Sequence, residues 1–87
     1  MSFILGSPVE GSPRPSFHAL LEGQQAIVEL DSGAVFRLAE QATPKEIARI
    51  LDGKRDIISE AAARLVGGGF VTRRGDSIEI LITALDL

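Results

Sequence analysis

Apolar residues alternate with mostly polar ones over two neighbouring stretches in the first third of the chain. Every second position is apolar from 17 to 21 and again from 26 to 30, and Gly23 lies in the short connection between them. A period of two is typical of a half-buried β-strand, and a connection that contains glycine allows a tight turn. We therefore predict an antiparallel hairpin over 16–30.

The residues before this hairpin predict an extended N-terminal segment over 1–15. Three prolines and two glycines interrupt it at intervals that neither a helix nor a central strand tolerates. The apolar residues Phe3, Ile4 and Leu5 precede these interruptions. They could form a short edge strand that covers other apolar side chains.

A short helix is predicted over 31–40. The side chain of Asp31 can cap free N–H groups at a helix start, and apolar residues follow at helical spacing. The stretch 35–38 is also compatible with a continuing strand, so the pattern leaves both conformations open.

A longer helix is predicted over 44–66. Thr43 suits the N-cap, Pro44 suits the first helical position, and Glu46 completes a capping box. Three glycines follow the helix and can end it, while Gly53 in its middle allows a kink. Apolar spacing of three and four marks the buried stripe. Its positions are Ile47, Leu51, Lys54, Ile58, Ala61 and Leu65, widened by Ile50, Ile57, Ala62 and Val66.

The last third of the chain predicts a second hairpin over 70–83, with its turn around Gly75. The fold class is therefore α+β in a single domain over 1–87. We expect an antiparallel sheet of three to five strands, built from two hairpins and packed against one long helix plus a short helix. The pattern does not determine the strand order.

Composition narrows the classes of protein. The chain has 87 residues, nine basic and twelve acidic side chains, no cysteine and one histidine. We expect no disulfide framework, no metal, no cofactor and no membrane span, because a span needs about 20 apolar residues. The first residues have no basic segment, so we expect no signal peptide and a cytoplasmic protein.

Several short stretches carry a resemblance to a known family. They are Ser16-Phe17-His18-Ala19, the positions Leu30, Ala34, Val35, Arg55, Ile58, Ala61 and Ala62, and the C-terminal Ile78–Leu87 with its Thr-x-x-Asp-Leu ending. In these the chain resembles the small bacterial proteins called domain of unknown function 1488. It departs from them at Val9-Glu10, where members often carry an aromatic–acidic pair. The resemblance implies an α+β domain and no established activity.

Four basic residues are the candidates for contact with an anion or a partner. Lys54 falls on the apolar stripe of the long helix and Arg55 follows it, while Arg73 and Arg74 lie at the predicted hairpin tip. A charge on a core-facing stripe must reach solvent or find a partner, so a structural role is the first interpretation. The alternative is a weak nucleic-acid or anion-binding accessory protein. Two arginines without aromatic support neutralise few phosphates, which makes nucleic acid an improbable partner.

Catalytic chemistry is not indicated by the sequence. His18 lies on a predicted strand, opposite in face to Phe17 and Ala19, and no nucleophile and base pair with it. The glycines at 67–69 follow a helix, whereas a phosphate loop precedes one. We expect no enzyme and no catalytic residue.

Leu81 indicates an interaction surface. It interrupts the polar side of the strand that contains Ile78, Ile80 and Ile82, and such a strand is normally covered on both faces. One helix covers one face, so we expect a homodimer in which Leu81 joins the apolar residues Phe3, Leu5 and Leu85 at the interface. The alternative is that the N-terminal segment folds back over Leu81. We thus expect a small non-enzymatic protein-interaction module, whose partner is itself or an unidentified protein.

Overall fold

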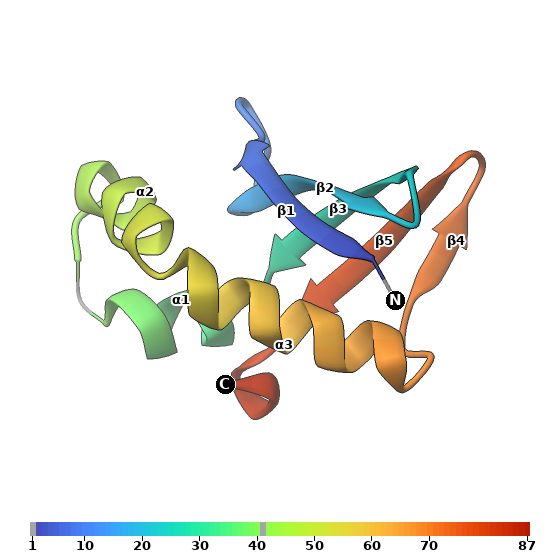
Figure 1. The fold of residues 1–87 in the computed structure, drawn as a ribbon. Helices are drawn as coiled ribbons and strands as arrows, with labels where there is room; N and C mark the ends of the chain where they lie inside the picture. The colour runs from blue at the N-terminus through green and yellow to red at the C-terminus, as the bar shows by residue number, and fades with distance from the viewer. Residues whose placement is uncertain (1, 41) are drawn as a thin grey trace.

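The computed structural model of the chain describes residues 2–40 and 42–87 as an α+β fold (Figure 1). The N-terminal half contains β1 (Phe3–Pro8), β2 (Ser16–Leu21), β3 (Gln24–Leu30) and α1 (Ser32–Ala39). The C-terminal half contains α2 (Pro44–Gly53), α3 (Arg55–Gly67), β4 (Thr72–Arg74), β5 (Ser77–Ile82) and the 3-10 turn η1 (Ala84–Asp86). Both predicted hairpins are confirmed, as β2–β3 and β4–β5.

The five strands form one sheet in the order β1-β2-β3-β5-β4. The prediction of an antiparallel sheet is only partly right, because β3 and β5 pair in parallel, with Val28 opposite Ile80. The second hairpin joins the first through β5, its longer and more apolar strand. The three-residue β4, exposed at every position, is left at the edge, where a short polar strand exposes little unpaired backbone.

The N-terminal segment is more ordered than predicted. β1 pairs antiparallel with β2, and the register shifts between Leu5 and Pro8. The sequence predicts an extended segment over 1–15 with an edge strand only at Phe3, Ile4 and Leu5, yet the strand continues to Pro8. Met1 of the predicted segment lies outside the described residues.

The prediction of one helix over 44–66 is only partly right, because the stretch is helical but is divided into α2 and α3. Lys54 separates them with backbone angles of φ −110° and ψ 26°, and its N–H bonds to the carbonyl of Leu51. Gly53, the last residue of α2, has the low helix propensity that favours a break at this point. The break interrupts the predicted stripe, and Ile57 is 48% exposed instead of buried.

The predicted capping residues lie at the starts of α1 and α2, but only one of them makes the predicted hydrogen bond to a backbone N–H. Asp31 caps α1, its Oδ1 accepting from the N–H of Ala34 at 2.8 Å, and the predicted short helix forms over Ser32–Ala39. Thr43 is the N-cap of α2, but its side chain accepts no backbone N–H. Its hydroxyl instead donates to Oε1 of Glu46 at 2.9 Å.

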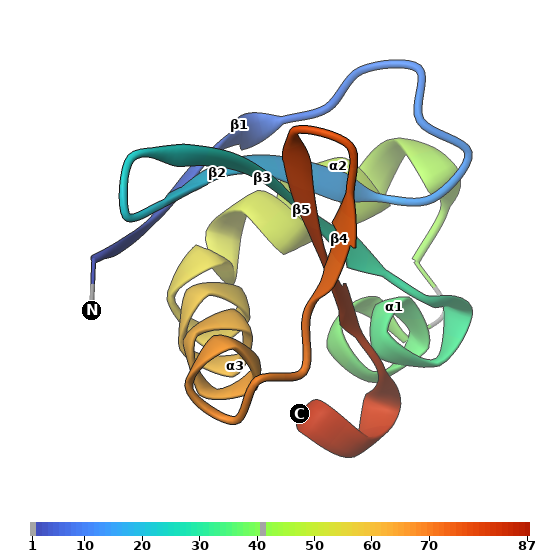
Figure 2. The same cartoon turned by 90° about the vertical axis from the view of Figure 1, so that its right-hand side faces the viewer.

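A single core lies between the sheet and the helices, and in Figure 2 α1 and α3 lie below β1 and β2. The sheet contributes alternate residues and the helices contribute small and branched ones. The fully buried large side chains are Val28, Leu30, Leu51, Ile58, Ile78, Ile80 and Ile82. Within residues 2–40 and 42–87, no helix is long and apolar enough to cross a membrane.

Candidate functional site

The face of the sheet that is turned away from the core carries exposed apolar residues. We call it the open face. Three large apolar side chains on it are exposed, at 59% for Ile4 and 43% for both Leu20 and Leu81. Its residues are Ile4, His18, Leu20, Gln25, Ile27, Glu29, Thr72, Arg74, Ser77, Glu79 and Leu81. An exposed apolar surface of this kind, bordered by polar residues, often marks an interface.

The strand register places these residues in rows across the open face. Ile4 lies opposite Leu20, which lies opposite Gln25. In the next row His18, Ile27 and Glu79 lie side by side on three strands.

A third row pairs Glu29 with Leu81. The apolar residues therefore run diagonally, from Ile4 and Leu20 through Ile27 to Leu81, with His18 and the carboxylates on either side.

One part of the open face is hollowed, to a volume of about 540 Å³. The hollow lies over β1, β2 and β3, and its apolar walls come from Ile4, Leu20 and Ile27. His18 borders it, and Gly6 contributes space because it has no side chain. The hollow and Leu81 occupy opposite ends of the apolar diagonal.

The four residues of the predicted interface are divided between two places. Leu81 and Leu85, the latter 96% exposed, line one groove beside β5 together with Phe70. Phe3 and Leu5 instead pack against the core from β1, the edge strand at the opposite end of the strand order from β5 and β4. β1 pairs with β2, so the N-terminal strand does not fold back over Leu81.

Lys54 and Arg55 bind the protein's own backbone. The ammonium group of Lys54 donates to the carbonyl of Leu38. Nη2 of Arg55 donates to the carbonyl of Leu5 at 2.9 Å, where the pairing of β1 with β2 shifts register. The guanidinium also lies 5.7 Å from the ring centre of Phe17, within range of a cation–π contact. Both cations thus tie helices to neighbouring elements, as the structural interpretation requires.

Arg73 and Arg74 lie elsewhere, on the exposed edge strand β4. Nε of Arg74 is 3.7 Å from a carboxylate oxygen of Glu79, and its side chain is 78% exposed. β4 lies beyond the C-terminus of α3, whereas Arg55 begins that helix, so about 20 Å of helix separates the two pairs (Figure 1). The four basic residues do not form one patch.

Replacing Arg55 with alanine should lower the free energy of unfolding by about 1–2 kcal/mol, because a charged hydrogen bond and a cation–π contact are both lost. Arg73→Ala, on the exposed β4, should change it by less than about 0.5 kcal/mol. Urea denaturation of the two variants measures the difference. Equal stability of the two would remove the structural role assigned to Arg55.

His18 has no catalytic neighbours on the described surface. It is exposed on the open face, beside Ile27 in the strand register. Among residues 2–40 and 42–87, no group of three histidine, aspartate or glutamate side chains could hold a metal ion.

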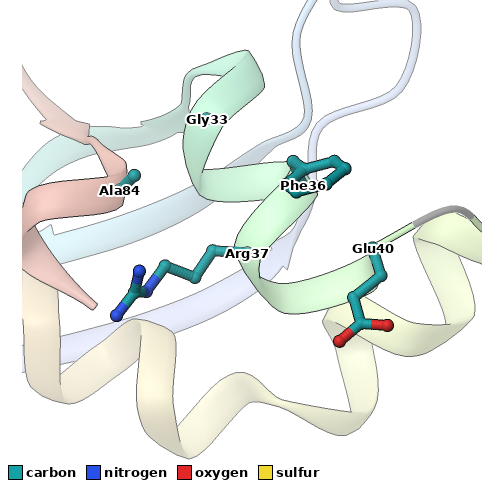
Figure 3. Close-up of a pocket in the computed structure, with 5 residues that line it drawn as sticks. All are labelled: Gly33, Phe36, Arg37, Glu40 and Ala84. Carbon is teal, nitrogen blue, oxygen red and sulfur yellow. The ribbon is translucent and has the colours of Figure 1, made fainter.

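A second hollow, of about 530 Å³, lies between α1 and η1 (Figure 3). Phe36 and Ala84 give it an apolar wall, and Phe36 is 62% exposed. Arg37 and Glu40 extend in different directions from α1, so their charges do not converge on one point. This arrangement lacks the convergent polar groups that fix a small ligand.

In comparisons of the chain with protein-family models, curated proteins and solved structures, none matches it.

The sequence pattern identifies Leu81 and does not single out Leu20 and Ile27, which lie on the same open face. The signal was available, because Leu20 and Ile27 are apolar residues at positions where strands with one solvated face carry polar ones.

Proposed function

We propose that this protein is a small non-enzymatic interaction module that forms a homodimer through the open face of its sheet. The observation that carries the proposal is the one-sided cover of the sheet. α1, α2 and α3 each contribute buried residues to the core on one face of the sheet, and the other face exposes Ile4, Leu20 and Leu81.

The size of the open face favours a weak, concentration-dependent dimer. The strands lie about 4.8 Å apart, and β1, β2, β3 and β5 have six or seven residues each, so the open face spans on the order of 400 Å². This is about half the area that each partner buries in a standard interface, and interfaces of this size are typical of weak or transient association.

The absence of cysteine from the sequence supports a reducing compartment such as the cytoplasm.

Sedimentation equilibrium over a range of concentrations tests the proposal. The mass of the wild-type protein should rise from 9.3 kDa towards twice that value. A mass that stays at 9.3 kDa at the highest concentration would contradict self-association.

The alternative function, weak binding of nucleic acid or another polyanion, has less support. Lys54 and Arg55 are engaged with backbone carbonyls, and Arg73 and Arg74 are distant from them. Salt-dependent retention on heparin distinguishes the two functions. We expect elution at low salt, since few cations are free to release counterions from a polyanion.

Family membership is a proposal of the same kind. We propose that the chain belongs with the domain of unknown function 1488 proteins. The β2 strand and the closing η1 turn, capped by Thr83 and Asp86, occupy the positions of the quoted motifs.

A further inference from the structure

We propose that, in this dimer, the Leu81 side chain of each copy enters the hollow on the open face of the other. The inference rests on the proposed function and adds the identity of the contacts and the orientation of the two sheets. A two-fold dimer needs a surface that is complementary to itself, and the open face has this property in shape and in charge.

The complementarity in shape comes from the two ends of the apolar diagonal. Leu81 is exposed on β5, and its row across the sheet continues with Glu29 and Ser16, neither of which is apolar. The hollow lies over β1–β3, and Ile4, Leu20 and Ile27 give it apolar walls. One copy therefore offers a branched apolar side chain where a second copy, turned by 180°, offers an apolar recess.

The complementarity in charge follows from the neighbours of these two features. Glu29 lies directly beside Leu81 in the strand register, and His18 borders the hollow. When Leu81 enters the second copy's hollow, Glu29 approaches the second copy's His18, whose imidazole N–H can donate to a carboxylate. The same exchange places Glu79 against Gln25 rather than against another carboxylate.

The exchange also fixes the orientation of the sheets. A two-fold axis parallel to the strands would put Leu81 against Ser16, and an axis across the strands would put it against Ser77. Only an axis between these directions brings Leu81 to Leu20, and it makes the strands of the two copies cross steeply. This is the orthogonal class of sheet packing.

The sequence contains no cysteine, so single cysteines can report the contacts without interference. Leu81→Cys mixed with Leu20→Cys should give a cross-linked mixed dimer with a short bis-maleimide, several times more than either variant gives alone. Ile27→Cys, near the axis, should link to itself. The control is Ile57→Cys, on an exposed helical position away from the open face.

Each outcome decides one of the two proposals. In a protein that sediments as a dimer, either of two results would overturn the entry of Leu81 into the hollow. One is efficient self-linking of Leu81→Cys, and the other is a yield of mixed links no higher than that of Ile57→Cys. A protein that sediments as a monomer overturns the proposed function as well.

The charge contact has its own test by sedimentation. His18→Glu should weaken the dimer several-fold, and adding Glu29→Lys should restore most of the affinity. An unchanged dissociation constant in His18→Glu would remove the contact between His18 and Glu29.

Discussion

Leu51→Ala should lower the free energy of unfolding by about 2–5 kcal/mol. Leu51 is 2% exposed and is the buried residue that α2 contributes to the core. Truncation leaves a cavity between α2 and the sheet that the short helix can only partly close. A loss of this size is a large share of the stability of a domain of 87 residues.

The matched control is Arg49→Ala, two residues away on an exposed position of the same helix. It should change stability by no more than about 0.5 kcal/mol. Both unfolding curves should be measured at low concentration, where association adds nothing to stability. Equal denaturation midpoints would contradict the packing of α2.

Leu81→Lys should weaken the dimer by about tenfold or more, equivalent to about 1.4 kcal/mol. The lysine would place an ammonium group in the apolar hollow of the second copy. The ammonium group would lose its hydration there, and no carboxylate in the strand row that lines the hollow could pair with it. Sedimentation equilibrium gives the dissociation constant directly.

Ile57→Lys is the control for this change. Ile57 is 48% exposed against 43% for Leu81, so the two substitutions replace equally accessible aliphatic residues. Ile57 lies on α3 rather than on the open face, and its lysine variant should dimerise like the wild type. If both variants dissociate equally, the interface is not the open face.

Local features of the fold could be predicted from the sequence because short-range interactions determine them. The turn at Glu22 and Gly23, with φ of 54° and 79°, follows from a glycine between two alternating runs. Asp31 caps α1 and Pro44 begins α2 for reasons that involve only their nearest neighbours. Gly67–Gly69 end α3 in the same way.

The pairing of β3 with β5 could not be predicted from such local signals. A hairpin signal specifies which two strands share a turn, and it does not specify which of them meets the next hairpin. The difference in apolar content between the two strands decides the pairing. β5 buries Ile78, Ile80 and Ile82 and therefore takes the inner position, whereas β4 is polar throughout and lies at the edge.

The break at Lys54 shows a different limit. Helical periodicity continues across it, so the pattern predicts one helix and one stripe. A local preference of about 1 kcal/mol at Gly53 suggested a kink, and tertiary contacts then decide whether the chain bends. Here the bend lets Lys54 reach Leu38 and Arg55 reach Leu5.

The candidate site was predicted in part. Leu81 could be found because it is apolar at a polar position of an otherwise regular strand. Phe3 and Leu5 were assigned to the same surface, but strand order places β1 and β5 apart, and both residues turn towards the core. Strand order is the long-range information that a single strand does not contain.

The most direct measurement of the central claim, that the open face is the dimer interface, is the concentration dependence of methyl resonances in NMR spectra. On dilution, the methyl signals of Ile4, Leu20, Ile27 and Leu81 should shift together. Those of Ile57, which is exposed on α3 away from the open face, should stay constant. Shifts confined to Ile57, or no shift at any methyl group, would contradict the account.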